Sequence, residues 1–110
     1  MMPEPGTLAG TSAGGLIVHV EGERCRISPA DVRALIFFGR PAPVVRERVR
    51  RASGTITGEV TIEGYAALNA AGKAVVIRTR EGTWTVPLAS LRRVACGEAT
   101  SAPLFSEVEV

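Results

Sequence analysis

Two stretches of the sequence alternate apolar and polar residues with a period of two, and this feature constrains the fold most strongly. The first stretch covers residues 16–27 and the second covers residues 75–86, and each contains a glycine near its middle. Successive side chains of a β-strand point to opposite faces of a sheet. Each stretch therefore predicts a β-hairpin with one apolar face.

The first hairpin has a predicted register. With Gly22 and Glu23 as its two turn residues, Val20 pairs with Cys25 and Val18 pairs with Ile27, and these four residues share one face. His19 then lies on the opposite face of the sheet.

The two hairpins belong to longer stretches, residues 16–51 and 75–110, which align with each other. In both, the hairpin is followed by a short connector, in which Pro29 begins a single helical turn of the first copy. A further apolar segment comes next, Leu35–Phe38 or Leu91–Cys96, and each is expected to be a strand. The alignment predicts an internal repeat, although two hairpins built by the same rules also resemble each other.

The region between the hairpins contains two more candidate elements. Residues 55–62 alternate and predict a strand, in which Gly58 indicates a bulge or a close approach of the backbone. Residues 44–51 fit either a strand with arginines on one face or a short helix near 43–52. The strand is favoured, because the matching segment 106–110 alternates as a strand does.

These patterns predict an all-β fold, a compact small barrel or sandwich of about eight strands. The predicted repeat builds it from two similar units, each a hairpin plus a strand. The alternative is an α+β fold with one short helix near 43–52.

The length and composition predict one domain. The chain has 110 residues, of which 45% are hydrophobic and 22% are charged. Such a chain buries a core large enough to fold without a metal or disulfides. We expect residues 15–110 to form this domain. Residues 1–14 are rich in Gly, Pro, Ala, Ser and Thr and predict a disordered N-terminal tail.

The apolar segments and the cysteine content indicate where the protein is located. No segment approaches the roughly 20 apolar residues of a membrane span, and residues 1–15 lack the pattern of a signal peptide. Cys25 and Cys96 are too few for a disulfide scaffold. We therefore expect a cytoplasmic protein, away from membranes, with two buried free thiols.

The sequence lacks the patterns of catalytic and metal sites. His19 is the only histidine, and the predicted register places it on the face opposite Cys25, so a nucleophile has no evident base. Neither cysteine has a second Cys or His two to five residues away, as zinc sites do. The glycines lie in turns, strands or the tail and not in a phosphate-binding loop. We expect no enzyme, no cofactor and no metal.

Arginine supplies the main functional signal, since Lys73 is the only lysine. A sheet face lined with arginine can follow a nucleic-acid backbone. A solvated face with salt bridges produces the same pattern, and the net charge of +2 is small for a dedicated nucleic-acid binder. The candidate binding face consists of Arg46, Arg48, Arg50, Arg51, Arg78, Arg80, Arg92 and Arg93.

The C-terminal segment is acidic on one face and apolar on the other. As a strand it is expected to lie beside residues 46–51, within one chain or across a dimer, because opposite charges on neighbouring strands attract. The candidate assembly strand consists of Phe105, Glu107, Val108, Glu109 and Val110.

These features predict a non-catalytic protein-interaction or assembly module that self-associates through β-strand edges as a homo-oligomer. The alternative is a small nucleic-acid-binding β domain that uses its arginine-lined faces.

Overall fold

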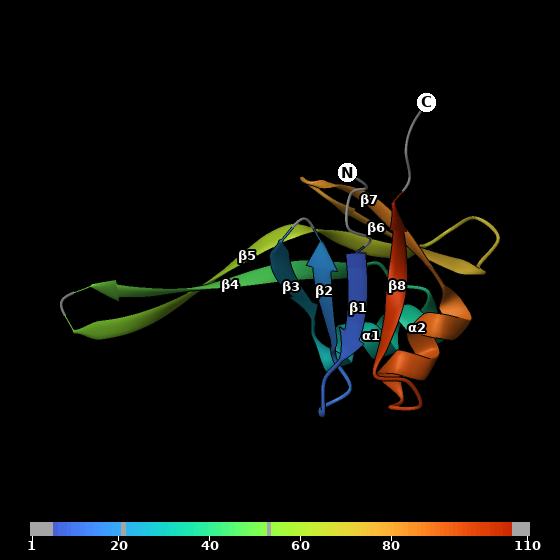
Figure 1. Ribbon diagram of the computed structural model, residues 1–110, viewed down its shortest axis with the longest axis horizontal. Helices are drawn as coiled ribbons and strands as arrows, with labels where there is room; N and C mark the ends of the chain where they lie inside the picture. The colour runs from blue at the N-terminus through green and yellow to red at the C-terminus, as the bar shows by residue number, and fades with distance from the viewer. Residues whose placement is uncertain (1–5, 21, 53, 107–110) are drawn as a thin grey trace.

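The protein is a closed antiparallel β-barrel of eight strands in chain order, with one helix pair (Figure 1). The computed structural model describes residues 6–20, 22–52 and 54–106, with the backbone alone at 48–52, 56 and 57. The strands are β1 (Gly6–Gly10), β2 (Leu16–Val20), β3 (Glu23–Ile27), β4 (Ala42–Ala52), β5 (Thr55–Leu68), β6 (Ala74–Thr79), β7 (Gly82–Pro87) and β8 (Ser101–Ser106). The helices are α1 (Pro29–Phe38) and α2 (Leu88–Ala95). The predicted small all-β barrel is confirmed.

The first predicted hairpin is present as β2–β3, but its register is wrong. Val20 pairs with Glu23 and not with Cys25, and Gly22 in the turn between them has a φ of 74°. The correction moves every partner by two residues, so each side chain keeps its predicted face. Cys25 is accordingly buried and His19 is exposed.

Helix α1 begins at a well-capped turn. The Ser28 hydroxyl oxygen accepts a hydrogen bond from the Asp31 amide at 3.2 Å, and its hydroxyl donates to the Asp31 carboxylate at 2.7 Å. Pro29 occupies the first helical turn, where its missing N–H costs nothing. Gly39 ends the helix in the left-handed region with a φ of 65°.

The prediction of a buried strand over Leu35–Phe38 is wrong, because α1 continues through these residues. Val32 and Leu35, three positions apart, turn toward the core, while Phe37 and Phe38 are 69% and 74% exposed. The apolar run therefore follows the helical period of 3.6 and not the strand period of two. The single predicted helical turn is the start of a ten-residue helix.

The predicted strand over Leu91–Cys96 is also wrong, because α2 covers residues 88–95. Leu91 and Val94 are buried, whereas Arg92 and Arg93 are exposed. This spacing gives an amphipathic helix with one narrow apolar side.

Part of the predicted N-terminal tail is ordered. Strand β1 pairs with both β2 and β8 and closes the barrel, and Leu8 is fully buried. The small residues that suggested disorder permit close packing, since a Cβ at Gly10 would lie 2.7 Å from the Val94 carbonyl oxygen. The prediction of a tail over residues 1–14 is therefore wrong for β1, and its first five residues lie outside the described chain.

Residues 42–52 form strand β4, so the predicted strand is confirmed and the α+β alternative with a helix near 43–52 is wrong. Strand β5 includes the predicted strand 55–62 and extends beyond it. The order β-β-β-α-β occurs in each half of the chain. Element order alone does not establish a duplication, so the internal repeat of 16–51 and 75–110 stays a prediction.

One hydrophobic core fills the barrel and continues under the helices. Helix α1 contacts β4 and β5, α2 contacts β1, β6, β7 and β8, and the two helices contact each other (Figure 1). The largest fully buried side chains are Leu8, Leu16, Ile27, Leu35, Ile77, Leu91 and Leu104. None of the helices in the described ranges is long and apolar enough to cross a membrane.

The close backbone approach that was predicted at Gly58 occurs instead at Gly64, where β5 passes β6. A Cβ at Gly64 would overlap the Arg78 carbonyl group, whereas a Cβ at Gly58 would have no heavy atom within 4 Å. We expect Gly64→Ala to lower the free energy of unfolding by at least about 2 kcal/mol, and Gly58→Ala to change it by less than about 0.5 kcal/mol.

Urea denaturation of both glycine variants measures this difference. Equal stabilities of the two variants would contradict the packing of β5 against β6 at this position.

Candidate functional site: the β4–β5 arm

Strands β4 and β5 extend beyond the barrel as a two-stranded arm (Figure 1). Strand β3 pairs with β4 at a single position, Arg26 with Val45, and β6 pairs with β5 only from Gly64 to Leu68. Past these positions β4 and β5 have no described strand neighbour except each other. We call residues 45–62 the arm.

A bulge at the root of the arm sets which residues share a face. Val44 pairs with Gly64 but Val45 pairs with Ile62, which leaves Glu63 as the extra residue of β5. Val44 is fully buried inside the barrel, whereas Val45 is half-buried on the outer side.

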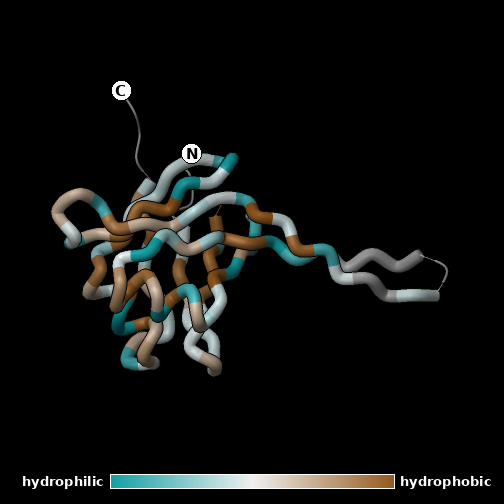
Figure 2. The backbone as a smooth tube through the Cα atoms, turned by 180° about the vertical axis from the view of Figure 1, so that it is seen from behind, coloured by the Kyte–Doolittle hydropathy of each residue, from teal (hydrophilic) through white to brown (hydrophobic). Residues whose placement is uncertain are grey.

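One face of the arm carries its described apolar side chains, together with Glu47. Val45 pairs with Ile62, and Glu47 pairs with Val60. Directly paired residues of antiparallel strands lie on the same face. Ile62 is 50% exposed and Val60 is 55% exposed. The segment next to the barrel alternates between hydrophobic and hydrophilic residues along each strand (Figure 2).

The other face is polar. Arg46 pairs with Thr61, and the backbone register continues with position 48 opposite Glu59 and position 50 opposite position 57. The sequence places arginines at 48 and 50 and threonine at 57. The described side chains of this face, Arg46, Glu59 and Thr61, are all polar.

The two long edges of the arm differ in charge. The β4 edge carries four arginines between positions 46 and 51. The β5 edge carries one charged residue, Glu59, between Thr55 and Ile62. Charged residues protect exposed strand edges from pairing with other chains, so the β5 edge is the less protected one.

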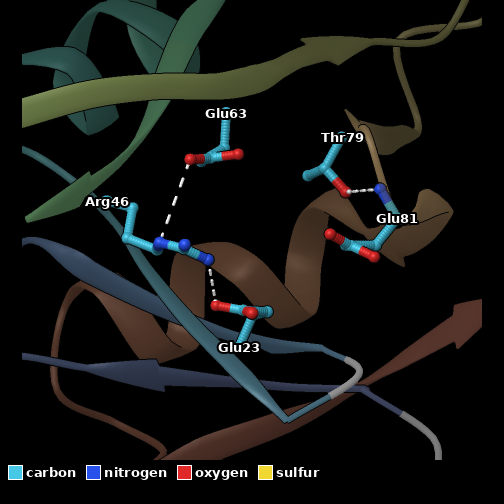
Figure 3. Close-up of polar contacts among 5 residues, drawn as sticks. All are labelled: Glu23, Arg46, Glu63, Thr79 and Glu81. Atoms are coloured by element: carbon cyan, nitrogen blue, oxygen red, sulfur yellow. Dashed lines mark hydrogen bonds and ion pairs between the residues drawn. The ribbon is translucent and has the colours of Figure 1, made fainter.

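At the root, Arg46 lies between two carboxylates from different strands (Figure 3). Its guanidinium donates a hydrogen bond to Glu23 of β3, and its Nε lies 3.9 Å from the Glu63 carboxylate. The Arg46 side chain is 20% exposed and that of Glu63 is 15% exposed. These partly buried contacts connect β3, β4 and the bulge, and they hold the arm against the rim of the barrel.

Cys25 lies inside this end of the barrel and is unsuited to nucleophilic chemistry. Burial raises the pKa of its thiol above the usual 9.0, and the Glu63 carboxylate raises the same pKa further. The nearby Arg46 acts in the opposite direction, with a smaller effect than either. Since the thiolate is the reactive form, Cys25 stays protonated and inert near neutral pH. Cys96 is free as predicted but exposed, so the expectation that both thiols are buried is wrong for Cys96.

A groove of about 660 Å³ lies outside the barrel where β3 and β4 separate. Its lining includes Ile17, Arg24 and Val45, together with the ion pair between Arg26 and Glu47 at 3.4 Å. Both side chains of this pair are about half exposed, so it contributes little to stability. The groove continues the apolar face of the arm onto the barrel wall.

The eight arginines of the predicted binding face fall in three parts of the fold. Positions 46, 48, 50 and 51 belong to β4, and positions 78 and 80 belong to the β6–β7 hairpin. Positions 92 and 93 belong to α2, which contacts the barrel elsewhere. The structure therefore does not bring them together in one row.

The predicted assembly strand is described only as far as Ser106. Strand β8 pairs with β1 and β7, and not with β4, so the placement of Phe105 beside residues 46–51 of the same chain is wrong. Glu107, Val108, Glu109 and Val110 lie outside the described residues. That this segment lies beside residues 46–51 of a second chain in a dimer stays a prediction.

No group of three or more His, Cys, Asp or Glu side chains is placed to hold a metal within the described ranges. His19 and Cys25 are on opposite faces of the sheet, as predicted.

Comparisons with known proteins do not identify the chain. No family model, no curated protein and no solved structure matches it.

Several residues of the arm and of its root are not identified as functional by the sequence. Glu23 and Glu63 become partners of Arg46 only through the barrel topology and the bulge, which no local pattern indicates. Val60 and Ile62 were assigned to a strand. Their exposure follows from the length of that strand beyond its neighbour β6, which the sequence does not reveal.

The ion pairs at the root lead to a test of stability. Removal of the Arg46 guanidinium leaves two carboxylates at a partly buried site, so we expect Arg46→Met to lower the free energy of unfolding by about 1–3 kcal/mol. Arg26→Met removes the exposed pair with Glu47 and serves as the control, with an expected loss below about 0.5 kcal/mol. Chemical denaturation of both variants checks this, and equal losses would contradict the anchoring role.

The thiols lead to a test of reactivity. At about pH 8, an aromatic disulfide reagent should label one thiol rapidly in the folded protein and both thiols after unfolding. The reason is that burial raises the pKa of Cys25, whereas Cys96 is exposed. Cys96→Ser should abolish the rapid phase and Cys25→Ser should preserve it. The reverse result would contradict the assignment.

Proposed function

We propose that this protein is a non-catalytic assembly module and that the arm joins two copies of the chain. The observation that carries the proposal is the exposed apolar face of the arm, where Val60 and Ile62 are each at least half exposed beside a weakly protected strand edge. Large exposed side chains that lie together mark interaction surfaces more often than isolated ones do.

The stability of a two-stranded ribbon supports the need for a covering partner. An isolated hairpin is marginally stable in water, because one face has nothing to pack against. The barrel supports the arm at its root through Arg46 and Gly64, but Val60 and Ile62 farther out remain at least half exposed. A second strand beside β5 would add cross-strand side-chain contacts to these residues and bury part of their surface.

The charges of the two edges favour a second copy joined through β5. Two β4 edges would bring four arginines from each chain together, and like charges across a strand pair are destabilising. Two β5 edges meet with one carboxylate from each chain, and their backbone N–H and C=O groups are complementary in an antiparallel pair. A two-fold axis between the arms gives this arrangement and closes the assembly as a dimer.

The apolar faces restrict the register of such a pair. Val60 and Ile62 of both copies lie on one face only when even-numbered residues of one β5 strand pair with even-numbered residues of the other. A shift of the pairing by one residue would turn these side chains of the second copy to the opposite face. The result is a four-stranded sheet whose apolar face comes from both arms. That face also meets the groove beside Arg26 and Glu47.

A nucleic-acid-binding β domain is the second candidate. The observation in its favour is the protruding ribbon with an arginine-containing face, because a two-stranded ribbon fits the major groove of DNA. Arg46 is held by Glu23 and Glu63, which reduces the charge available at the root. Binding to duplex DNA that weakens steeply with salt would support this candidate over the dimer.

Light scattering coupled to size exclusion tests the assembly. We expect a dimer of the wild-type chain that dissociates on dilution. The double variant Val60→Arg, Ile62→Arg should raise the dissociation constant at least about tenfold, because it places charge in the apolar contact. Both side chains are exposed, so the fold and the circular dichroism spectrum should be unchanged.

Thr61→Arg is the matched control, since Thr61 lies on the opposite face of the same strand. It should associate as the wild type does. A wild-type chain that stays monomeric at all concentrations, or an equal effect of the two substitutions, would overturn the proposal.

A further inference from the structure

A second groove, of about 590 Å³, lies between α1 and α2, beside Arg92 and Arg93 of the predicted binding face. One side of the groove comes from α1, with Val32, Ile36 and Phe37, and the other comes from α2, with Ala89 and Ala95. Phe37 is 69% exposed at its edge. The groove therefore combines an apolar floor with an accessible aromatic ring.

The rim of this groove is basic. Arg33 of α1 faces the groove across from Arg92 and Arg93 of α2, and all three are exposed. Glu98 is the one carboxylate in the lining, and it lies 3.8 Å from Arg93 with both side chains about two-thirds exposed. Such an exposed pair is weak, so the groove keeps a net positive charge.

We infer that this groove binds the acidic C-terminal segment, residues 107–110, of a second copy of the chain. The segment reads Glu-Val-Glu-Val. In extended form its two carboxylates point to one side and its two valines to the other. The carboxylates can form ion pairs with the three guanidinium groups of the rim, and the valines can pack on the apolar floor.

The dimensions agree with this occupant. The ten residues of α1 extend over about 15 Å, at a rise of about 1.5 Å per residue. Four extended residues span about 13 Å. The segment therefore fits along the length of the groove without a turn.

The segment must come from another copy. Strand β8 packs against α2 and is antiparallel to β7, which leads into α2, so its Ser106 end points away from the start of that helix (Figure 1). Its six residues cover about 17–20 Å, and the four residues after Ser106 reach at most about 14 Å. To enter the groove of their own chain these four residues would first have to reverse the direction of β8, which leaves too few of them to lie extended along α1 and α2.

This contact rests on the proposed assembly function, but it uses a surface separate from the arm. An isologous contact through the arms and a head-to-tail contact through the C-terminal segment would link dimers into larger assemblies. Leu104 is fully buried between β1 and β7, so a truncation that begins at residue 104 would damage the core. Removal of residues 107–110 alone avoids this problem.

Fluorescence anisotropy tests the contact directly with a labelled peptide of residues 105–110. The peptide is added to the full-length double variant Val60→Arg, Ile62→Arg, so that association through the arm plays no part. We expect binding that weakens as salt is raised, since the contact pairs exposed charges. A peptide with Glu107→Gln and Glu109→Gln should bind at least about tenfold more weakly.

Substitutions in the groove identify the site. Arg33→Glu with Arg92→Glu should reduce the affinity for the peptide at least about tenfold, whereas Arg24→Glu with Arg78→Glu, a control of equal charge change on the barrel wall, should change it less than about threefold. All four side chains are exposed, so the variants should fold normally.

Three results would overturn the inference: absence of peptide binding, equal loss in both pairs of variants, or loss that follows substitution of arginines on β4 instead. None of these results bears on the dimer through the arm, which light scattering of the wild-type chain measures separately.

Discussion

The structure depends on one constraint, which is that a closed barrel has no free strand edges. Each of the eight strands pairs with two neighbours, and β1 pairs with β8 to complete the ring. Free edges arise in the described part of the wall only where a strand is longer than its neighbour. Strands β4 and β5 have 11 and 14 residues, whereas β3 and β6 have 5 and 6. The difference in length produces the arm.

The root of the arm shows how the barrel supports this extension. The bulge at Glu63 changes which face of β5 is turned outward, and Arg46 connects that residue to Glu23 across the rim. Gly64 allows β5 to approach the β6 backbone at the same level. The described contacts that hold the arm to the barrel thus lie at its root, while Val60 and Ile62 beyond it remain at least half exposed.

The barrel also separates two surfaces of different chemistry. The arm presents an apolar face and a weakly charged edge, which favour contact between identical chains. The groove between α1 and α2 presents arginines around an apolar floor, which favour an acidic extended segment. In the proposed assembly, one contact would pair the β5 edges of two arms and the other would join opposite charges.

The sequence predicted the parts of the fold that depend on local alternation. The two hairpins, the strand at 55–62 and the class of fold are confirmed, because period two is visible in neighbouring residues. The prediction of a strand over Leu35–Phe38 was wrong because four consecutive apolar residues fit either a strand or a helix. In the structure they belong to the helix that begins after its N-cap, Ser28. The predicted register of β2–β3 was wrong because a shift of two residues in the pairing leaves every side chain on the same face. The alternation of apolar and polar residues therefore does not distinguish the two registers.

The candidate site was less accessible from the sequence. Clustered arginines were recognised, but their separation into three parts of the fold depends on where the barrel places β4, β6 and α2. The contact between Arg46 and Glu23 joins residues 23 positions apart, and the bulge at Glu63 determines the second contact. These are consequences of topology, which one sequence does not specify locally.

Amide hydrogen exchange of the full chain at a low and a high protein concentration tests the central claim most directly. Residues 55–62 of β5 should exchange more slowly at the high concentration, because pairing with a second arm protects their N–H groups, while strand β2 inside the barrel should show no such change. Exchange of residues 55–62 that is the same at both concentrations would contradict the claim that the arm is covered by a second copy.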